Sequence, residues 1–562
     1  MWALFVDKII AQGFYNVVPR ILENEKKFCL ILVIYGVVIS VFTLAIPISV
    51  QALVGSVTNT LLLRPVLILT SILLGLLLFS VVLNAIQIYV MEMMERHIYS
   101  YVTKEMALRL LYAESNVIDN INRTTLANKY FEIMSLQKAL PNILVRGFAL
   151  LLQTTVGLIL VSFYHYFLFA LNIIIFLMLY LVWAFWKNKA FSHAVKVSSA
   201  KYETARLLAE IARSNSLFRS NKLIDFACNQ VNDATYDYVK IRKKYFRSYF
   251  AQHIGFLAIY AFGSTALLGV GGWLVIKEQL TIGQLVAAEL IMSSIFYGVT
   301  KFAYHLSDLY QLYSSCVKIN DFYDLPLQKQ TGNLKLPKNQ PCALKMQEVI
   351  TQQREENIFF NMEIRAGEKI MAHVANQPIE TAFVKLIKKQ TKYSGKIYFN
   401  DVNLFDLDVQ YLQDSVIIID NHYIIEVSIK NWLLLAKPSA THDEMLQVLE
   451  LVELYDVVSG FPDGINTMIK PYGYPLHFSE MMKLKLAAAI LSEPAMLIIN
   501  GVFDSLNHAQ RERIIMRILE LPPTFIYFTN ARTIAGFDNY LLLNNKKHIS
   551  FDNPQDYEVS FE

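Results

Sequence analysis

Long apolar stretches dominate the first 300 residues of the chain. Six segments have about 20 mostly apolar residues in a row, the length that a helix needs to cross the hydrocarbon core of a membrane. Four of these segments contain no Asp, Glu, Lys or Arg, whereas Arg146 lies near the start of the third and Glu289 lies within the sixth. The pattern predicts six transmembrane helices, at residues 28–50, 66–90, 143–163, 166–186, 254–276 and 282–299.

The polar segments between these spans predict the orientation of the chain. Segments 93–140 and 187–247 carry six and thirteen Lys and Arg residues, and the opposite side carries little more than Arg64 and Lys277. Because cytoplasmic loops are rich in basic residues, both termini are predicted to be cytoplasmic. Ahead of the first span, residues 1–26 read as an amphipathic helix on the membrane surface.

The two basic segments also predict long helices outside the membrane. Both keep a helical pattern with few Gly or Pro over about 50 and 65 residues, which is too long for ordinary loops. We therefore expect the spanning helices to continue into the cytoplasm. Their turns would form tips, available to a cytoplasmic domain, at Asn120 and Arg123 and again at Ser214 and Arg219.

Composition supports a membrane protein and excludes other classes. Hydrophobic residues make up 54% of the chain and charged residues 17%, against about 45–50% and 25% in soluble domains. The net charge of +4 is too small to indicate nucleic acid binding, so we read the basic cluster 242–247 as membrane-flanking charge. The four cysteines are far apart with no CxxC motif, which excludes a disulfide scaffold and a cysteine zinc site. No metal site is predicted.

The composition becomes that of a soluble domain after about residue 325. Residues 326–339 read as a linker, and short apolar runs then alternate with helical patterns, as in an α/β domain. The expected organisation is a surface segment at 1–26, a membrane domain at 27–325, the linker, and an α/β domain at 340–562.

The order of short motifs in the α/β domain carries a resemblance. Gly-Glu-Lys-Ile at 367–370 precedes a helix, Leu-Ala-Ala-Ala-Ile-Leu-Ser-Glu-Pro at 486–494 precedes an apolar strand at 496–499, and Asp-Ser-Leu-Asn follows at 504–507. In order and spacing this part resembles the nucleotide-binding domain of an ABC transporter. Residues 279–289 are similar to the last span of ABC exporters of the type I secretion group.

The resemblance implies a fold, a location and partners. The fold would be an all-α six-helix transmembrane ABC exporter domain (type IV ABC fold), followed by an α/β ABC nucleotide-binding-like domain. The protein would be a homodimer or heterodimer of ABC-like chains in the bacterial inner membrane. A periplasmic membrane-fusion adaptor would be a partner, as in secretion systems.

The phosphate-binding motif departs from the family pattern. A Walker A loop needs G-x-x-x-x-G-K-[ST], because glycines let backbone N–H groups wrap a phosphate that the lysine neutralises. Residues 374–381 occupy its place, with both glycines replaced and Glu380 where the lysine should be. Thr381 keeps the hydroxyl that binds magnesium in the family. Glu380 also has a purely structural reading, since a carboxylate near a helix N-terminus complements the helix dipole.

The other motifs depart from the pattern as well. The Walker B strand should end in Asp and Glu, which hold magnesium and orient water, but here it ends in Asn500 and Gly501. Asn421 occupies the Q-loop position and Asn530 the position of the switch histidine. The signature motif is replaced by the sequence His477, Phe478, Ser479 and Glu480.

These departures lead to a functional prediction. The chain is predicted to be a pseudo-ATPase and not an enzyme, with no catalytic residues, no ATP or magnesium and no other cofactor, and with its old cleft filled by side chains such as Phe478. His477 and Glu480 are read as a surface pair rather than an acid/base pair. The chain would act as a transport component or scaffold of a secretion-type complex. The alternatives are a subunit of a heteromeric exporter powered by an active partner, and a new enzyme, which no constellation of residues supports.

Overall fold

The computed structural model consists of two compact units, Met1–Leu327 and Gln328–Glu562. The residues that it describes are 2–43, 48–50, 52–53, 63–114, 123–328, 332–337, 339–353, 356–420, 423–470, 473–530, 534–545 and 548–553.

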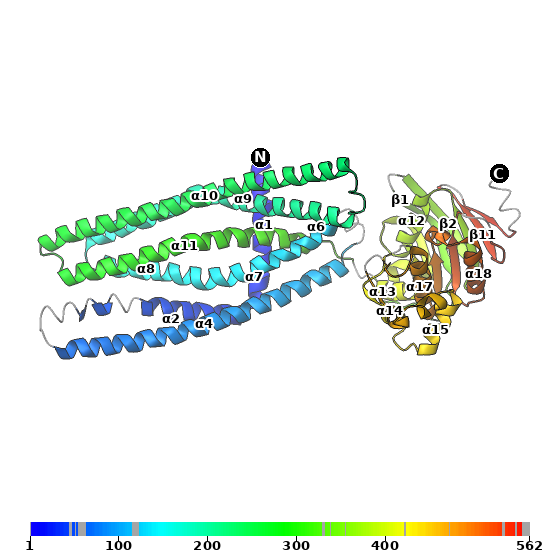
Figure 1. Cartoon of the computed structure of the whole chain (residues 1–562), viewed down its shortest axis with the longest axis horizontal. Coiled ribbons are helices and arrows are strands. Elements are labelled where there is room, and N and C mark those ends of the chain that lie inside the picture. The colour runs from blue at the N-terminus through cyan, green and yellow to red at the C-terminus, as the bar shows by residue number, and fades with distance from the viewer. Residues whose placement is uncertain are drawn as a thin grey trace. The chain divides into compact units, whose positions relative to one another are not determined.

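The first unit is built of helices (Figure 1). Short helices stand at its beginning and in its middle, and four long ones make up most of its length. Its elements are α1 (Trp2–Asn24), α2 (Lys26–Thr43), α4 (Leu63–Leu111), α6 (Arg123–Asn128), η1 (Lys129–Phe131), α7 (Glu132–Asn142), the π-helical turn η2 (Ile143–Gly147), α8 (Phe148–Ser162), α9 (Tyr166–Arg213), α10 (Asn221–Ile276) and α11 (Ile282–Tyr323).

Among the described residues, five helical segments are long and apolar enough to cross a membrane. They are Val66–Leu111, Leu126–Ser162, Tyr166–Arg213, Asn221–Ile276 and Ile282–Tyr323. These segments contain five of the six predicted spans. The predicted first span, 28–50, begins in α2, but residues 44–47 lie outside the described part of the chain. A count of six spans therefore stays a prediction.

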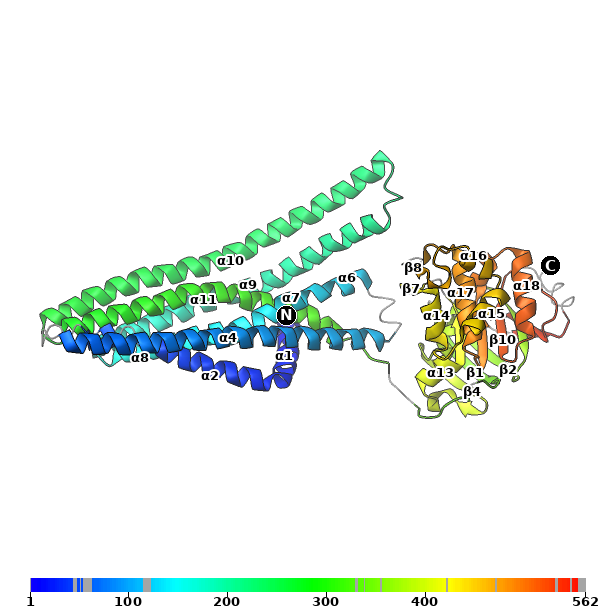
Figure 2. The ribbon, with the colours of Figure 1, turned by 60° about the horizontal axis from the view of Figure 1, so that its bottom comes forward.

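The long helices exceed the thickness of a membrane. The 56 residues of α10 reach about 84 Å at 1.5 Å per residue, against a hydrocarbon core of about 30 Å. In α9 and α10 the long apolar stretches without charged residues lie at one end, and the tip of the hairpin formed by the opposite ends extends away from the other helices (Figure 2). The helices thus continue beyond their apolar spans, as the sequence predicts.

Glycines allow the apolar parts of these helices to approach closely. A Cβ atom built on Gly263 of α10 would lie 2.4 Å from the ring of Phe296 in α11, and one on Gly157 of α8 would lie 2.8 Å from Ile295. Both neighbours belong to the buried core of the apolar region. Small residues at such contacts are typical of helices that pack within membranes.

The segment predicted as a surface helix forms α1, and the second half of this helix packs on protein. Val17 and Ile21 are fully buried, in a core that they share with Leu312, Cys316 and Ile319 of α11. The reason is again a glycine, since the Cβ position of Gly13 lies 3.1 Å from the backbone of α11.

The second unit contains a six-stranded sheet that is mostly parallel. The strand order is β12-β11-β3-β10-β9-β6, and only β12 runs antiparallel to its neighbour. A four-stranded antiparallel sheet, β2-β1-β4-β5, and the pair β7-β8 complete the strands. The bounds are β1 (Leu344–Gln353), β2 (Glu356–Ile364), β3 (Lys369–Val374), β4 (Tyr393–Phe399), β5 (Val402–Asn403), β6 (Val416–Ile419), β7 (Val427–Ser428), β8 (Met468–Ile469), β9 (Met496–Ile499), β10 (Thr524–Phe528), β11 (Asn539–Leu543) and β12 (His548–Phe551).

Two hydrophobic cores cover the two faces of the six-stranded sheet. Alternate residues along a strand point to opposite faces, so Phe525 and Tyr527 join one core while Ile526 and Phe528 join the other. The first core contains most of the helices and the second contains α12 and the antiparallel sheet. The helical elements are α12 (Gln377–Ile387), η3 (Leu404–Asp406), α13 (Val409–Ser415), α14 (Ile429–Ala436), α15 (His442–Leu451), α16 (Tyr455–Ser459), η4 (Gly464–Asn466), α17 (Phe478–Leu491), η6 (Gly501–Ser505) and α18 (His508–Leu519).

Candidate functional site

The carboxyl ends of four parallel strands bring four of the predicted site residues together. Strands β3, β10, β9 and β6 are neighbours and run in the same direction. In open α/β sheets ligands bind at this edge. The residues that follow these strands lie there, and Glu380, Asn500, Gly501 and Asn530 are among them.

The connection from β3 to α12 is short and differs from a Walker A loop. Only Ala375 and Asn376 separate the end of the strand from the first residue of α12, Gln377. The next residue, Pro378, has no backbone N–H to offer a phosphate. The Thr381 hydroxyl donates a hydrogen bond of 3.1 Å to the Gln377 carbonyl within the helix. Most of the segment 374–381 is therefore helix rather than a loop that wraps a ligand.

Glu380 is buried at this edge. Its relative exposure is 9%, and its Oε1 accepts a hydrogen bond of 3.4 Å from the backbone N–H of Gly501. Burial raises the pKa of the Glu380 carboxyl to about 7, because hydrogen bonds from Gly501 and Asn500 offset the lost hydration only in part. The nearby charges of Asp504 and Asp420 raise this pKa further. The carboxylate thus occupies a backbone donor that an anionic ligand would otherwise use.

The Asn500 side chain connects the residues that follow β9 with the residue that follows β6. Its Oδ1 caps the short helix η6 by accepting from the Val502 N–H at 3.1 Å, and its Nδ2 donates to the Asp420 carbonyl at 3.0 Å. The Asp420 carboxylate in turn forms an ion pair of 2.5 Å with Lys388. Both ends of the Asn500 side chain are therefore engaged by the protein.

Asp504 connects the segments at this end of the sheet, and it was not among the predicted site residues. Its carboxylate accepts hydrogen bonds from Tyr527 at 2.5 Å, from the Thr529 hydroxyl at 2.7 Å and from the backbone N–H of Asn530 at 3.0 Å. It thereby connects η6 to the end of β10. Asp420 was missed as well, although a signal existed: it directly follows the apolar run of β6, at the carboxyl end of a parallel strand.

The residues at the signature position begin α17. The backbone N–H of His477 donates to the Glu480 carboxylate at 2.8 Å, which is the N3-to-N-cap half of a capping box. Glu480 thus has a structural role, because its side chain caps the N-terminus of α17. Ser479 lies in the first turn, and Phe478 is 41% exposed. The prediction that Phe478 fills a cleft is therefore not met within the single chain.

Of the two predicted helix tips, the one at Ser214 and Arg219 lies fully within the described residues. Ser214 is the C-cap residue that follows α9, and its carbonyl accepts from the Leu217 N–H at 2.9 Å in the turn toward α10. Arg219 donates to the Asn215 side chain at 3.3 Å and is exposed. Arg123 begins α6. Asn120, like the Q-loop position Asn421, lies outside the described residues.

We tested whether the edge of the sheet fits ATP and magnesium, which the fold family implies. A triphosphate needs consecutive backbone N–H groups and a cation at the loop after β3. The structure instead has a helical turn with a proline, a buried carboxylate at Glu380 and the carboxylate of Asp504 beside Gly501. Segment 374–381 does not fit the phosphates of ATP in the Walker manner.

Comparisons with known proteins relate the chain to transporters. Residues 29–299 match the family described as the ABC transporter transmembrane region. A leukotoxin translocation ATP-binding protein, LktB of Mannheimia glucosida, is 23% identical over 258 residues, which cover 45% of this chain and 36% of that protein. The alpha-hemolysin translocation ATP-binding protein HlyB of Escherichia coli O157:H7 is 21% identical over 287 residues, which cover 50% and 40%. The chain thus spans less than half the length of these curated relatives.

A solved structure shows the same fold. It is that of a bacterial Atm1-family ABC exporter with ATP bound, with a TM-score of 0.80 and 13% sequence identity, and the match covers 96% of this chain and 97% of that one. At such low identity the likeness speaks for the fold alone.

The comparisons correct one prediction. The chain was predicted not to be an enzyme, but the relatives that it matches are named ATP-binding proteins, and the similar exporter holds ATP. The prediction is therefore wrong. The physical reason is that it inferred the absence of an activity from the loss of motifs in one domain, while the similarity to ATP-binding transport proteins extends over about half of the chain. What the sequence and the structure do agree on is the architecture: residues 29–299 match the ABC transporter transmembrane region, the described residues include several helices long and apolar enough to cross a membrane, and the chain has the fold of an ABC exporter.

Proposed function

We propose that this chain is a subunit of an ABC exporter of the protein-secretion type, in which it acts as transport component or scaffold. The observation that carries the proposal is the match of residues 29–299 to the ABC transporter transmembrane region, together with relatives named for the translocation of leukotoxin and alpha-hemolysin. The cargo would be a protein or peptide. We place the exporter in the bacterial inner membrane with both termini in the cytoplasm, as a dimer of ABC-like chains with a periplasmic adaptor.

A secretion experiment tests the proposal. Removing the gene from its host should deplete one or a few proteins from the culture medium, and full-length protein should restore them. A version that ends at residue 339 should not restore them, because the second unit, Gln328–Glu562 (called the cassette below), is required if it takes part in transport. An unchanged set of secreted proteins in the deleted strain would contradict the proposal.

We further propose that segment 374–381 does not hold the phosphates of MgATP. The two-residue connection before α12, the proline at 378 and the buried Glu380 support this. Fluorescent ATP titrated into the purified chain with magnesium should show no affinity that depends on this segment, so Glu380→Gln and Thr381→Ala should leave any binding unchanged. Micromolar binding that either substitution weakens tenfold would refute the proposal.

The same features favour a second candidate, a heteromeric exporter whose partner chain carries a Walker-type site. Purification of the tagged chain from its own host distinguishes the two forms of the proposal. A second ABC chain with G-x-x-x-x-G-K-[ST] in equal amount would support the heteromer, and two copies of this chain would support the homodimer.

A further inference from the structure

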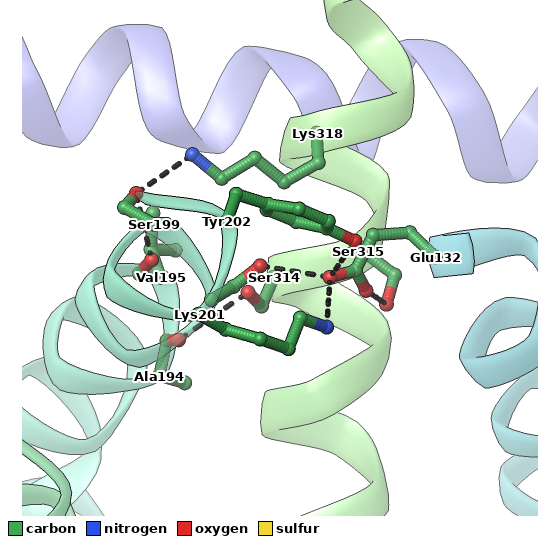
Figure 3. A network of polar contacts seen from close by, with 10 residues as sticks. Glu132, Ala194, Val195, Ser199, Lys201, Tyr202, Ser314, Ser315 and Lys318 are labelled. Carbon is green, nitrogen blue, oxygen red and sulfur yellow. Dashed lines mark hydrogen bonds and ion pairs between the residues drawn. The ribbon is translucent and has the colours of Figure 1, made fainter. Parts of the chain in front are cut away.

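A buried carboxylate joins three helices in the part of the first unit outside the predicted spans. Glu132 is the first residue of α7, and its side chain is only 4% exposed. Figure 3 shows it facing side chains of α9 and α11 that converge on it. Buried acidic residues are rare unless they are paired, so the contacts of this group identify what it holds.

The Glu132 network consists of four donors from two helices. From α9, Ser198, Lys201 and Tyr202 donate to Oε1 at 2.8, 2.9 and 2.7 Å. From α11, Ser315 donates to Oε2 at 2.5 Å. The partners are separated from Glu132 by 66 to 183 residues along the chain, so the network ties together segments that no local structure connects.

The negative charge of Glu132 and the positive charge of Lys201 strengthen these contacts. Burial alone would raise the pKa of the Glu132 carboxyl, but the hydrogen bond from Ser315 and the charge of Lys201 outweigh it, and the pKa lies below its ordinary value. The carboxylate is thus ionised at neutral pH. Removal of one member of a buried ion pair is costly, because it leaves the other charge without compensation.

The network borders a cavity that leaves one side of it unpacked. The cavity has a volume of about 200 Å³ and lies between α7, α9, α10 and α11. Glu132 and Lys201 line it, and so does Arg242 of α10. The Lys201 side chain is half exposed and borders this space, and Arg242 adds a second cationic group to its lining. Such an arrangement suits an element with two discrete states.

Two further contacts connect α9 to α11 next to the network. Lys318 donates to the Ser199 hydroxyl at 2.7 Å, and Ser314 donates to the Ala194 carbonyl at 3.3 Å (Figure 3). Neither involves a buried charge pair. Glu132 is the shared acceptor of the four donors described above, so its loss would remove these links of α7 to α9 and to α11 and leave the two direct contacts between α9 and α11.

We propose that Glu132 is a positioning residue that latches α7 to α9 and α11, and that the α9 side of this latch opens when the α9–α10 hairpin moves. The role during transport rests on the proposed function, whereas the latch itself is a property of the folded chain. In the latched state Lys201 and Ser198 hold α9 against the carboxylate. In the open state Lys201 turns into the cavity, and α9 is free to separate from α7.

Distance measurements between spin labels test the latch in the full-length chain. We suggest labels at Met134→Cys on α7 and Leu208→Cys on α9, both of which are exposed, in lipid nanodiscs. The exposed Cys228 and the partly exposed Cys29 are first replaced by serine. The two test variants are Glu132→Gln, which keeps the shape of the side chain, and Lys201→Met, which removes only the cation.

The control is a second ion pair on α9 that crosses to no other helix. Glu203 is exposed and pairs with Arg206 of the same helix at 2.7 Å. Glu203→Gln should therefore leave the distance distribution as in the unmodified chain. Both test variants should raise the ratio of long to short distances about tenfold, and their effects should not add in the double variant, because they break the same interaction.

The outcomes separate the latch from the proposed function. If Glu132→Gln does not fold, Lys201→Met decides, since it leaves the carboxylate with its three hydroxyl donors. An unchanged distance distribution in a folded Lys201→Met protein would overturn the proposal. A tenfold shift in a chain that restores no secretion would uphold the latch while the proposed function fails, because the distances are measured without cargo.

Discussion

Glu380 lies near a helix N-terminus, as the sequence predicts, and in an environment that the sequence does not predict. Its place near the start of α12 predicts a favourable interaction with the helix dipole. In the structure the carboxylate is buried and its pKa is raised to about 7. The sequence could not predict this environment, because the donor Gly501 is 121 residues away and the neighbouring carboxylates come from other strands.

The raised pKa of Glu380 predicts a pH dependence of stability. Because the folded-state pKa of about 7 exceeds the ordinary value of 4.5, ionisation of Glu380 destabilises the native state. The free energy of unfolding should fall as the pH rises from about 4.5 to about 7, by about 3 kcal/mol, and then level off. Glu380→Gln should remove this slope.

The cassette offers a simple probe for this measurement. Residues 328–562 form a compact unit with two cores of their own and contain a single tryptophan, Trp432, whose fluorescence reports unfolding in urea. Glu520→Gln, at an exposed site, serves as the matched control and should keep the slope. An equal slope in the Glu380→Gln protein would show that the buried carboxyl is not the cause.

At the scale of the element, the sequence predicts the long helices but not their contacts. Charge-free segments such as 254–276 identify a spanning helix because few soluble helices lack charges over that length. The close approach of Gly263 to Phe296 depends on the rotation of α10 against α11, which the sequence of α10 alone does not determine. The same holds for Glu132, whose donors are known only once α7, α9 and α11 are packed.

Two glycines of α10 should respond in opposite ways to alanine. Gly263→Ala places a methyl group 2.4 Å from the buried ring of Phe296 and should destabilise the membrane unit by about 1–3 kcal/mol. Gly269→Ala meets no atom within 4 Å and should be neutral or stabilise the helix by about 1 kcal/mol, because alanine favours helix formation. Thermal unfolding in one detergent checks both, and a lower stability of the Gly269→Ala protein would refute the packing argument.

At the scale of the whole molecule, composition predicts where the chain changes character. The apolar pattern ends near residue 325, and the compact units divide between Leu327 and Gln328. The α/β class of the second unit followed from the alternation of short apolar runs with helical patterns, and the direction of its strands was not predicted. Whether the chain is an ATPase could not be predicted from composition in the same way. The altered motifs lie at one end of the cassette sheet, whereas the relatives named for ATP binding match about half of the chain.

The predicted orientation can be checked with a cysteine that the chain already has. Cys228 is exposed on the polar part of α10, in the segment predicted to be cytoplasmic. A membrane-impermeant maleimide should label it in inside-out vesicles of the inner membrane. It should not label it in spheroplasts, in which the outer membrane is removed and the inner membrane is intact. Glu278→Cys, in the turn between α10 and α11, should show the reverse pattern in a Cys228→Ser background. Labelling of Cys228 from outside would contradict the orientation.

The most direct test of the account is the mass of the complex released from native membranes. An exporter-type subunit has to pair with a second ABC-like chain. Native mass spectrometry of the tagged protein should therefore show either twice the mass of the 64.5 kDa chain or this chain with one other ABC chain, with or without an adaptor. A stable monomer as the main species, in a detergent that keeps known exporters dimeric, would contradict it.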